Sequence, residues 1–556
     1  MFHVERKFQV VMNKHSVTGV VIDPMERETY GAEIYIANGR IDKIKRNCSI
    51  TEPYIIPGLV DSHVHIESSM LTPTNFARAA AVHGTVAAVC DPHEVANVAG
   101  VEGLDFMFND AKNAPIKLLF GVPSCVPASP FDECAQPFTP SIVGSLLDNG
   151  MEFLGEMMNY PGVIDGNQQV KGIIDEAAKR RKPIDGHAPG LVGPALSTYA
   201  QAGIGTDHEC YTMPEALEKI ALGMKILIRE GSAAKNFDAL HPLISSHPNM
   251  VMFCTDDCHP DDLERGHINL LLKRAVDNGH SIYDALMAAS INPVAHYGIG
   301  MGLLREGDWA DFVVVDSPRQ LRVLATYVNG VDVLKSQIDD NSQSVSNMLP
   351  LPAYCFPSSA DVAHINLQVQ AKTARCKAIG VLADQLVTEP WLFDVAPGQA
   401  VEANPDSDIL KIVVLSRYNP NRYSVGFIHG IGLKRGAIAD SIAHDSHHIV
   451  AIGADDASII QAMNYIAEQG GGLCVAVDGQ VHGLPLPVFG LMANAPVHSV
   501  ARAYSHINGL AIEAGCTIKA PFMTMAFMAL SVIPKLKIIP VGLFDGEKFC
   551  ITNMFI

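Results

Sequence analysis

The feature that most constrains the fold is an alternation of strand-like and helix-like segments between residues 57 and 300. Short apolar segments of the kind that form buried strands recur through this region, each followed by room for a helix. They are Gly58–His65, Thr85–Asp91, Lys117–Pro123, Glu152–Glu156, Pro183–His187, Gly203–His208, Met224–Arg229 and Val251–Asp256. About eight such βα units in this length are the expected pattern of a (β/α)8 barrel. The sequence therefore predicts an α/β, TIM-like barrel over residues 57–300.

Strand-like segments lie on both sides of this region. Residues 17–56 carry short apolar runs, and Asn38-Gly39 between two of them is a hairpin turn signal. Residues 307–316 and 321–334 supply further strand-like sequence. We expect these flanks, residues 1–56 and 301–340, to form one small β-sandwich domain.

The last part of the chain, residues 341–556, changes character. Leu349–Pro352 has the composition of a linker, and apolar strand-like runs follow it. Between two of these runs, Ile460, Met463 and Ile466 fall at helical spacing, which is typical of a helix packed on a core. We expect a C-terminal α+β domain here, with no catalytic pattern of its own.

Composition narrows the classes of partner. The net charge is -19, from 40 basic and 59 acidic residues, which argues against a nucleic-acid or anionic-membrane surface. The N-terminus lacks the apolar core of a signal peptide, and the most apolar segment, residues 520–534, is too short to span a bilayer. The 12 cysteines follow no spaced framework, as expected for free thiols in a reducing compartment. We expect a cytoplasmic protein.

Polar side chains stand at the ends of five of the predicted strands. His63 and His65 are one residue apart, so in a strand their side chains leave the same face. Catalytic groups of such barrels lie at the carboxyl ends of strands. Each of these residues alone also fits a buried histidine, a helix cap or a solvated carboxylate, but together they indicate a metal site. The remaining residues of the set are Glu156, His187, His208, Glu209 and Asp256.

Several longer sequence motifs resemble those of the amidohydrolase superfamily and, within it, of the adenine deaminases of the bacterial type. The general motifs are Pro57-Gly58-Leu59-Val60-Asp61-Ser62-His63-Val64-His65 and Gly307-Asp308-Trp309-Ala310-Asp311-Phe312. The narrower ones are Asp91-Pro92-His93-Glu94, Gly155-Glu156-Met157-Met158-Asn159, Thr206-Asp207-His208-Glu209, Arg229-Glu230-Gly231-Ser232, Thr255-Asp256-Asp257 and His444-Asp445-Ser446-His447-His448. In the last motif, His448 stands where the family leads us to expect Asn. The resemblance covers nearly the whole chain.

The resemblance implies a binuclear site of divalent metal ions. His63, His65 and Asp256 would bind one ion, and His187 and His208 the other. Glu156 would bridge them, where many members of the superfamily carry a carboxylated lysine. Mixed histidine and carboxylate ligands suit zinc, manganese or iron, and the family implies Mn(2+) or Fe(2+) rather than Zn(2+).

The implied reaction is the hydrolytic deamination of adenine to hypoxanthine and ammonia. Glu209 would protonate a ring nitrogen, and Asp256 would carry a proton from the attacking hydroxide to the amino group. Glu209 could instead orient His208. Two other functions stay open, namely another metal-dependent amide or ring hydrolase on the same barrel, and a scaffold without chemistry.

Four more residues are expected at the barrel mouth. Arg229, Glu230 and Ser232 would contact the purine edges or orient the loop over them. Alternatively, the segment would supply a rim ion pair and a turn glycine. His93 would contact substrate or cap the following helix. The cluster His444-Asp445-Ser446-His447-His448 would reach the barrel mouth or form a local turn network. We expect a small purine base as the partner, and a homodimer as the assembly.

Overall fold

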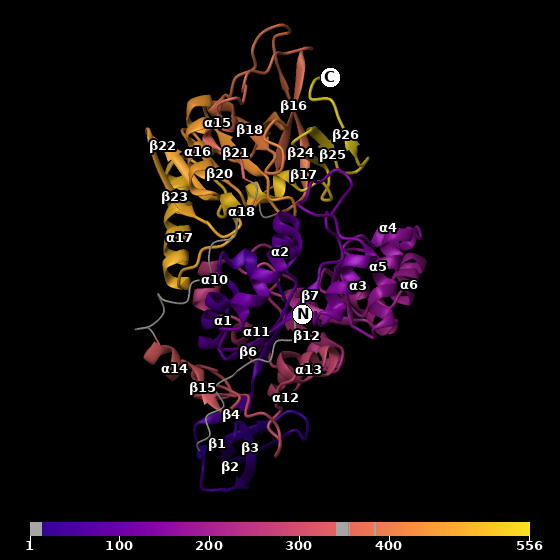
Figure 1. Ribbon diagram of the computed structural model, residues 1–556, viewed down its shortest axis with the longest axis vertical. Coiled ribbons are helices and arrows are strands. Elements are labelled where there is room, and N and C mark those ends of the chain that lie inside the picture. The colour runs from indigo at the N-terminus through magenta and orange to yellow at the C-terminus, as the bar shows by residue number, and fades with distance from the viewer. Residues whose placement is uncertain (1–13, 341–353, 355, 383–384) are drawn as a thin grey trace. The chain divides into compact units, whose positions relative to one another are not determined.

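The computed structural model describes residues 14–340, 354, 356–382 and 385–556. The chain divides into two compact units (Figure 1). The first comprises Met1–His93, Met107–Cys125 and Phe138–Pro350, and the second comprises Glu94–Phe106, Val126–Pro137 and Leu351–Ile556. Two stretches of the predicted barrel region therefore belong to the second unit. The domain boundaries expected from the sequence stay a prediction, as does the linker at Leu349–Pro352, which lies outside the described residues.

A barrel of parallel strands forms the centre of the first unit, as predicted. Its strands are β5 (Leu59–Val64), β6 (Thr85–Cys90), β7 (Lys117–Val122), β8 (Phe153–Met157), β9 (Ile184–Gly186), β10 (Thr206–Asp207), β11 (Lys225–Arg229) and β12 (Val251–Cys254). The hydrogen-bonded orders are β5-β6-β7-β8-β9 and β10-β11-β12. The Gly205 N–H donates to the Ile184 carbonyl at 2.9 Å, and the Asp256 N–H donates to the His63 carbonyl at 2.9 Å. These two bonds join the two sheets into a closed barrel.

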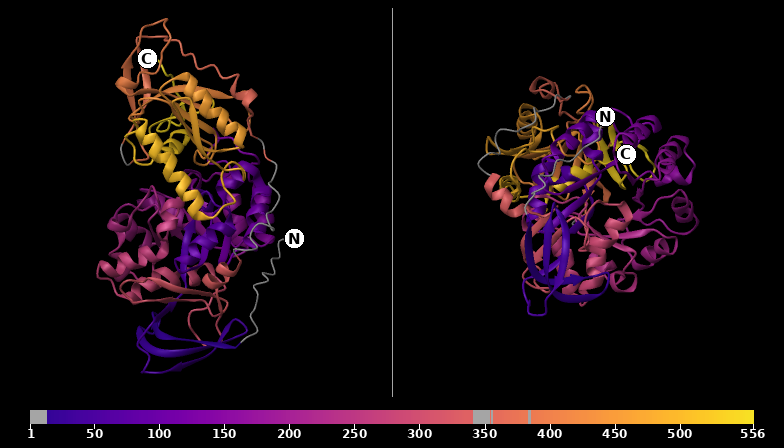
Figure 2. Two further views of the ribbon diagram at one scale, coloured as in Figure 1. Left: turned by 90° about the vertical axis from the view of Figure 1, so that its left-hand side faces the viewer. Right: turned by 60° about the horizontal axis from the view of Figure 1, so that its bottom comes forward.

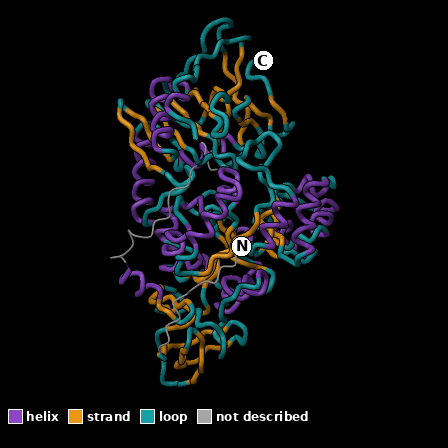
Figure 3. Tube along the Cα trace, viewed as in Figure 1, coloured by secondary structure: helices purple, strands orange, loops and turns teal. Residues whose placement is uncertain are grey.

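Helices follow the barrel strands along the chain, so strands and helices alternate in the tube of Figure 3. They are α1 (Pro73–Val82), α2 (His93–Ala111), α3 (Pro140–Asp148), α4 (Tyr160–Ile164), α5 (Gln168–Lys179), α6 (Gly193–Gln201), α7 (Met213–Ala221), α8 (Phe237–Leu240), α9 (Leu243–Ser246), α10 (Pro260–Arg265), α11 (Ile268–Asp277), α12 (Ile282–Leu286) and α13 (Asn292–Tyr297). β6, β7 and β12 are buried at every position, which is why they read as continuous apolar runs in the sequence.

The two flanks build one seven-stranded sheet in the order β15-β14-β13-β4-β1-β2-β3. Its strands are β1 (His15–Asp23), β2 (Glu28–Ala37), β3 (Arg40–Arg46), β4 (Tyr54–Pro57), β13 (Phe312–Val315), β14 (Val323–Val328) and β15 (Val331–Asp332), and α14 (Val333–Asp340) follows. The Ile41 N–H donates to the Asp308 carbonyl at 2.8 Å, so the β3 end meets the segment before β13. The expected sandwich is thus a single sheet that curls back around a core containing Ile34 and Phe312.

The second unit is an α+β domain, as predicted. Its main sheet has the order β17-β16-β19-β18-β21-β20-β22-β23. These strands are β16 (Arg375–Val381), β17 (Thr388–Asp394), β18 (Ile409–Leu415), β19 (Tyr423–His429), β20 (Ala437–Asp440), β21 (Ile449–Gly453), β22 (Gly472–Val477) and β23 (Gln480–Pro485). A small sheet joins β24 (Leu536–Ile539), β25 (Gly542–Asp545) and β26 (Cys550–Ile551), and the helices are α15 (Ser359–Val362), α16 (Asp456–Gln469), α17 (Val497–Glu513) and α18 (Pro521–Ala526).

The core of the second unit confirms the helical spacing in the sequence. α16 and α17 are its long helices (Figure 2). Met463 and Ile466 of α16 are buried in one apolar cluster with Val413 and Ala451 of the sheet, and Ile460 packs against that cluster.

The cysteines among the described residues are free thiols. None of the helices in the described residues has the length and hydropathy needed to cross a bilayer.

Candidate functional site

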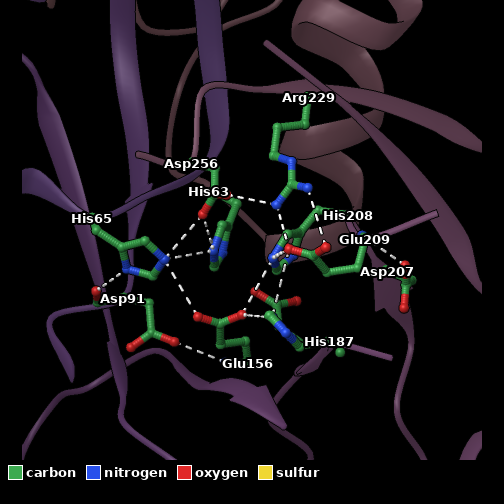
Figure 4. A network of polar contacts seen from close by, with 12 residues as sticks. His63, His65, Asp91, Glu156, His187, Asp207, His208, Glu209, Arg229 and Asp256 are labelled. Atoms are coloured by element: carbon green, nitrogen blue, oxygen red, sulfur yellow. Dashed lines mark hydrogen bonds and ion pairs between the residues drawn. The ribbon is translucent and has the colours of Figure 1, made fainter. Parts of the chain in front are cut away.

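Strand ends of the barrel bring the predicted histidines and carboxylates together (Figure 4). His63 lies in β5 and His65 directly after it, and the spacing of two places both rings on one face. Their Nε2 atoms are 3.2 Å apart. Asp256 follows β12, with Oδ1 at 3.1 Å from His65 Nε2 and 3.5 Å from His63 Nε2. The three side chains are almost fully buried and form one compact group.

The backbone holds Asp256 in an unusual conformation. Its φ is 58°, in the left-handed region that a non-glycine residue seldom adopts. Two hydrogen bonds maintain it, because the Asp256 N–H donates to the His63 carbonyl and its own carbonyl accepts from the His65 N–H at 3.2 Å. The pairing of β12 with β5 therefore aims this carboxylate at the two histidines.

Glu156, near the end of β8, lies between the first histidine group and a second one. Its Oε1 is 3.3 Å from His65 Nε2. Its Oε2 is 2.6 Å from His187 Nδ1 and 3.2 Å from His208 Nε2. One oxygen of Glu156 thus faces each group, which is the arrangement required of a bridging carboxylate.

Charge in the site keeps these carboxylates ionised. Burial alone would raise the pKa of Glu156, but His187, together with His208 and His65, holds the pKa of its carboxyl well below the ordinary value. Burial opposes ionisation of Asp256 too, and the Arg229 guanidinium lowers the pKa of that carboxyl well below its usual range. Burial would lower the pKa of the His187 imidazole, but the same contacts raise it to about 9, so binding of a metal ion there would release a proton from the ring.

Neighbouring groups orient the side chains of His65 and Glu156. His65 Nδ1 lies 2.9 Å from the Asp91 carbonyl oxygen, so it donates there and leaves Nε2 for the site. The Asp91 Oδ2 accepts from the Glu156 N–H at 2.8 Å. A Cβ at Gly155 would lie 2.3 Å from that same Oδ2, which explains why the residue before Glu156 is glycine.

Glu209 and Arg229 form a buried ion pair at the edge of the histidine groups. Arg229 is 1% exposed, and its guanidinium bonds to both oxygens of Glu209 and, at 2.7 Å, to Asp256 Oδ2. Glu209 Oε1 is 3.7 Å from His208 Nε2 and 3.9 Å from His187 Nδ1. Burial favours the neutral acid, but Arg229 lowers the pKa of Glu209 to about 2.

The other residues predicted at the barrel mouth have protein partners. Glu230 pairs with Arg274 at 2.8 Å, and the Ser232 hydroxyl donates to Asp262 at 2.6 Å. His93 begins α2, and its Nδ1 lies 3.6 Å from Glu156 Oε1. Glu230 thus forms an ion pair and Ser232 a hydrogen bond to Asp262, while the purine contacts of all these residues stay a prediction.

Asn236 is a buried residue to which the sequence alone assigned no role. Its Nδ2 donates to the carbonyls of His208 and Cys210, each at 3.1 Å, and its Oδ1 accepts from the Arg229 N–H at 2.7 Å. The side chain therefore fixes the ends of β10 and β11 relative to each other. The signal in the sequence is an asparagine a few residues beyond the end of β11 at Arg229.

Within the second unit, the side chain of Glu94 contacts the histidine-rich segment His444-Asp445-Ser446-His447-His448. Glu94 Oε1 is 3.0 Å from His444 Nδ1, its Oε2 accepts from the Asp445 N–H at 3.2 Å, and the same oxygen bonds to His447 Nε2. His448 Nδ1 instead accepts from the Arg417 N–H at 3.3 Å. The segment forms a turn network, and its anchor is Glu94, far away in the sequence.

The donor set fits divalent metal ions. Among the described residues, groups with ligand atoms within 4.8 Å of one another include His63, His65 and Asp256; His63, Glu156 and His208; and His187, His208 and Glu209. His63 Nδ1 is buried without a hydrogen-bond partner among the described residues. Four imidazoles and two or three carboxylates, closely spaced and shielded from water, are a donor set for borderline metal ions.

Comparison with known proteins agrees with this geometry. Residues 54–333 match the amidohydrolase family, and residues 385–550 match the adenine deaminase C-terminal domain. Proteins named adenine deaminase from Methanosarcina acetivorans and Salinibacter ruber are 46% and 44% identical to this chain, over 97% of it and 99% of each relative. One from Borreliella burgdorferi is 40% identical over 98% of the chain and 100% of the relative. Among solved structures, enamidase, an amidohydrolase superfamily member, matches 58% of this chain and 96% of its own, with a TM-score of 0.45 and 15% identity. The chain belongs to the amidohydrolase family and, over nearly its whole length, to the group of relatives named adenine deaminase.

Proposed function

We propose that this protein catalyses the hydrolytic deamination of adenine to hypoxanthine and ammonia. The observation that carries the proposal is the near full-length similarity to relatives named adenine deaminase, which extends through both units. The barrel supplies what the reaction needs, because ionised carboxylates and imidazoles meet at the strand ends.

Two divalent ions would be held by the histidine groups of the barrel. His63, His65 and Asp256 form the first ligand group, His187 and His208 the second, and Glu156 has one oxygen directed to each. Such ions lower the pKa of bound water and supply hydroxide at neutral pH. Mn(2+) or Fe(2+) are the proposed ions, in agreement with the resemblance noted in the sequence.

Two carboxylates of the chain would handle the protons. Asp256 Oδ1 faces His63 and His65, so this oxygen would accept the proton of the attacking hydroxide and pass it to the departing ammonia. Glu209 delivers a proton to a ring nitrogen of adenine. Because Arg229 pairs with Glu209, the carboxylate is ionised before reaction, so the proton that it delivers would be the one that the consumed water loses on becoming hydroxide.

The first test is adenine turnover by protein loaded with Mn(2+) or Fe(2+), followed by the change in purine absorbance and by ammonia release. We expect about two metal ions per chain, and loss of turnover and of one metal in His63→Ala. Protein that carries two metals yet leaves adenine intact would refute this function and favour the second candidate, another amide or ring hydrolase of the same family. Glu209→Gln that retains full turnover would refute the acid–base role of Glu209.

Two further proposals concern the cellular location of the protein and its oligomeric state. Free thiols at the described cysteines support a reducing, cytoplasmic location. A homodimer is proposed from the sequence, and light scattering of the purified chain tests it, since a monomeric mass at working concentrations would exclude it.

A further inference from the structure

Arg229 bonds to both Glu209 and Asp256, the two carboxylates that would transfer protons in the proposed reaction. The guanidinium NH1 bonds to Glu209 Oε1 and, at 2.7 Å, to Asp256 Oδ2, while NH2 lies 3.1 Å from Glu209 Oε2. Glu209 follows β10, Arg229 ends β11 and Asp256 follows β12, so one side chain connects three successive strand ends (Figure 4).

The two carboxylate oxygens of Asp256 have different partners. Oδ2 is occupied by Arg229, and Oδ1 is directed at His63 and His65. A carboxylate with a free torsion could turn either oxygen to the histidines. With Oδ2 held by a charged donor, a single orientation is favoured, since such hydrogen bonds are stronger than those between neutral groups.

Glu209 is restrained in the same way. Its two oxygens accept from the guanidinium, and the Tyr211 hydroxyl donates to Oε2 at 3.0 Å. Oε1 is the oxygen nearest the histidines, within 3.9 Å of both His187 and His208. The planar guanidinium therefore sets where Glu209 lies relative to Asp256, which a lysine ammonium would do with less directional precision.

The main chain of Arg229 is held by Asn236, which lies outside the site. The Arg229 N–H donates to Asn236 Oδ1 at 2.7 Å, and the Asn236 N–H donates to the Arg229 carbonyl at 3.0 Å. The side chain is also buried, so water competes little for its donors. A desolvated cation whose main chain is held in place can keep two carboxylates at a defined separation.

We propose that Arg229 is a positioning residue of the deamination, which fixes Glu209 and Asp256 relative to each other so that each keeps one oxygen turned to the histidine groups. The inference rests on the proposed function. It differs from the purine contact expected from the sequence, because here Arg229 acts through the two carboxylates and leaves adenine binding to other groups.

The test compares Arg229→Gln and Arg229→Lys with Arg180→Gln in metal-loaded protein. Arg180 is a matched control, since it also bridges two carboxylates, Asp148 and Glu176, but does so between α3 and α5, away from the site. We expect kcat for adenine to fall about 100-fold in Arg229→Gln. KM should stay within about threefold, metal content should stay at two per chain, and Arg229→Lys should recover part of kcat. Arg180→Gln should match the unchanged protein.

A double-mutant cycle separates positioning from a general loss of structure. If Arg229 acts through Glu209, adding Arg229→Gln to Glu209→Gln should reduce kcat by much less than it does alone. Additive effects, an unchanged kcat, or a raised KM at constant kcat would each overturn the proposal. So would failure of Arg229→Lys to fold, which would make the residue structural. If the unchanged protein carries two metals and releases no ammonia from adenine, the proposed function fails instead, and the two failures are thereby distinguished.

Discussion

Burial decides how much a lysine–glutamate pair on a helix stabilises this protein, and two such pairs in the barrel unit allow a direct test. Lys219 and Glu215 lie one turn apart on α7, with a 2.9 Å contact and no exposed surface on the lysine side chain. Lys179 and Glu176 lie one turn apart on α5 at 2.8 Å, but the side chain of Lys179 is 64% exposed. The contact distances are nearly equal, so the surroundings are the main difference.

Lys219 also has partners that Lys179 lacks. Its Nζ is 3.0 Å from Asp207 Oδ2 and donates to the Ala188 carbonyl at 2.7 Å. Asp207 in turn accepts from the N–H groups of Glu209 and Ala188, so this lysine supports the segments that carry the site. Burial by itself would lower the pKa of Lys219, and Asp207 with Glu215 raises it above the ordinary value. The lysine is charged in the folded protein.

Replacing Lys219 with Met leaves two buried carboxylates without their cation. Loss of one partner from a buried ion pair destabilises a protein by about 3–5 kcal/mol. The same change at Lys179 removes an exposed pair worth about 0.5 kcal/mol. We therefore expect the free energy of unfolding to fall by several kcal/mol in Lys219→Met and to change little in Lys179→Met.

Urea unfolding of the metal-free proteins, followed by circular dichroism, measures both losses under one set of conditions. The slope of free energy against urea should stay the same in all three proteins if only stability changes. Equal losses in the two variants, or a stable Lys219→Met, would refute the reasoning that burial sets the strength of these pairs.

The remaining predictions concern the metal ligands and the second unit. Glu156→Gln should keep the fold but bind fewer than two metal ions per chain by elemental analysis, because the neutral amide offers only one donor oxygen to groups on either side; an undiminished two ions would contradict the bridging role. Lys537 is fully buried, donates to the Leu386 carbonyl at 2.9 Å, and has its pKa lowered by burial from 10.5 to about 7. Between pH 7 and pH 10.5 the unfolded chain then holds a proton that the folded chain lacks, so stability should rise with pH across this window. Urea midpoints at pH 7 and pH 9 should show a smaller rise in Lys537→Met, and an identical rise would contradict a buried neutral amine.

Much of the fold and site was predictable because it depends on local pattern. Strands buried on both faces leave continuous apolar runs, and the eight expected barrel strands all form. The residues proposed as metal ligands stand at the ends of these strands, where the architecture places catalytic groups. His63 and His65 were the strongest signal, since a spacing of two in a strand sets the direction of both side chains.

Contacts between distant residues were beyond pattern reading. Arg229 was expected to face the purine or the rim, and it lies buried between Glu209 and Asp256, because the carboxyl ends of three neighbouring strands meet there. Glu94 stands one residue after His93 in the sequence, yet it belongs to the second unit and binds His444 and His447. Hydrophobic periodicity does not indicate which residues Arg229 and Glu94 contact.

The sequence by itself determined the barrel, the histidines and carboxylates at the strand ends, and the family, since periodicity, strand-end residues and long motifs are local properties of the chain. Only the tertiary structure decided how the flanking strands close into one sheet, which oxygen of Glu156 faces which histidine, and where Arg229 donates its hydrogen bonds. The physical reason is that hydrogen bonds and ion pairs depend on distances of about 3 Å between side chains, and those distances exist only after strands far apart in the sequence have packed together.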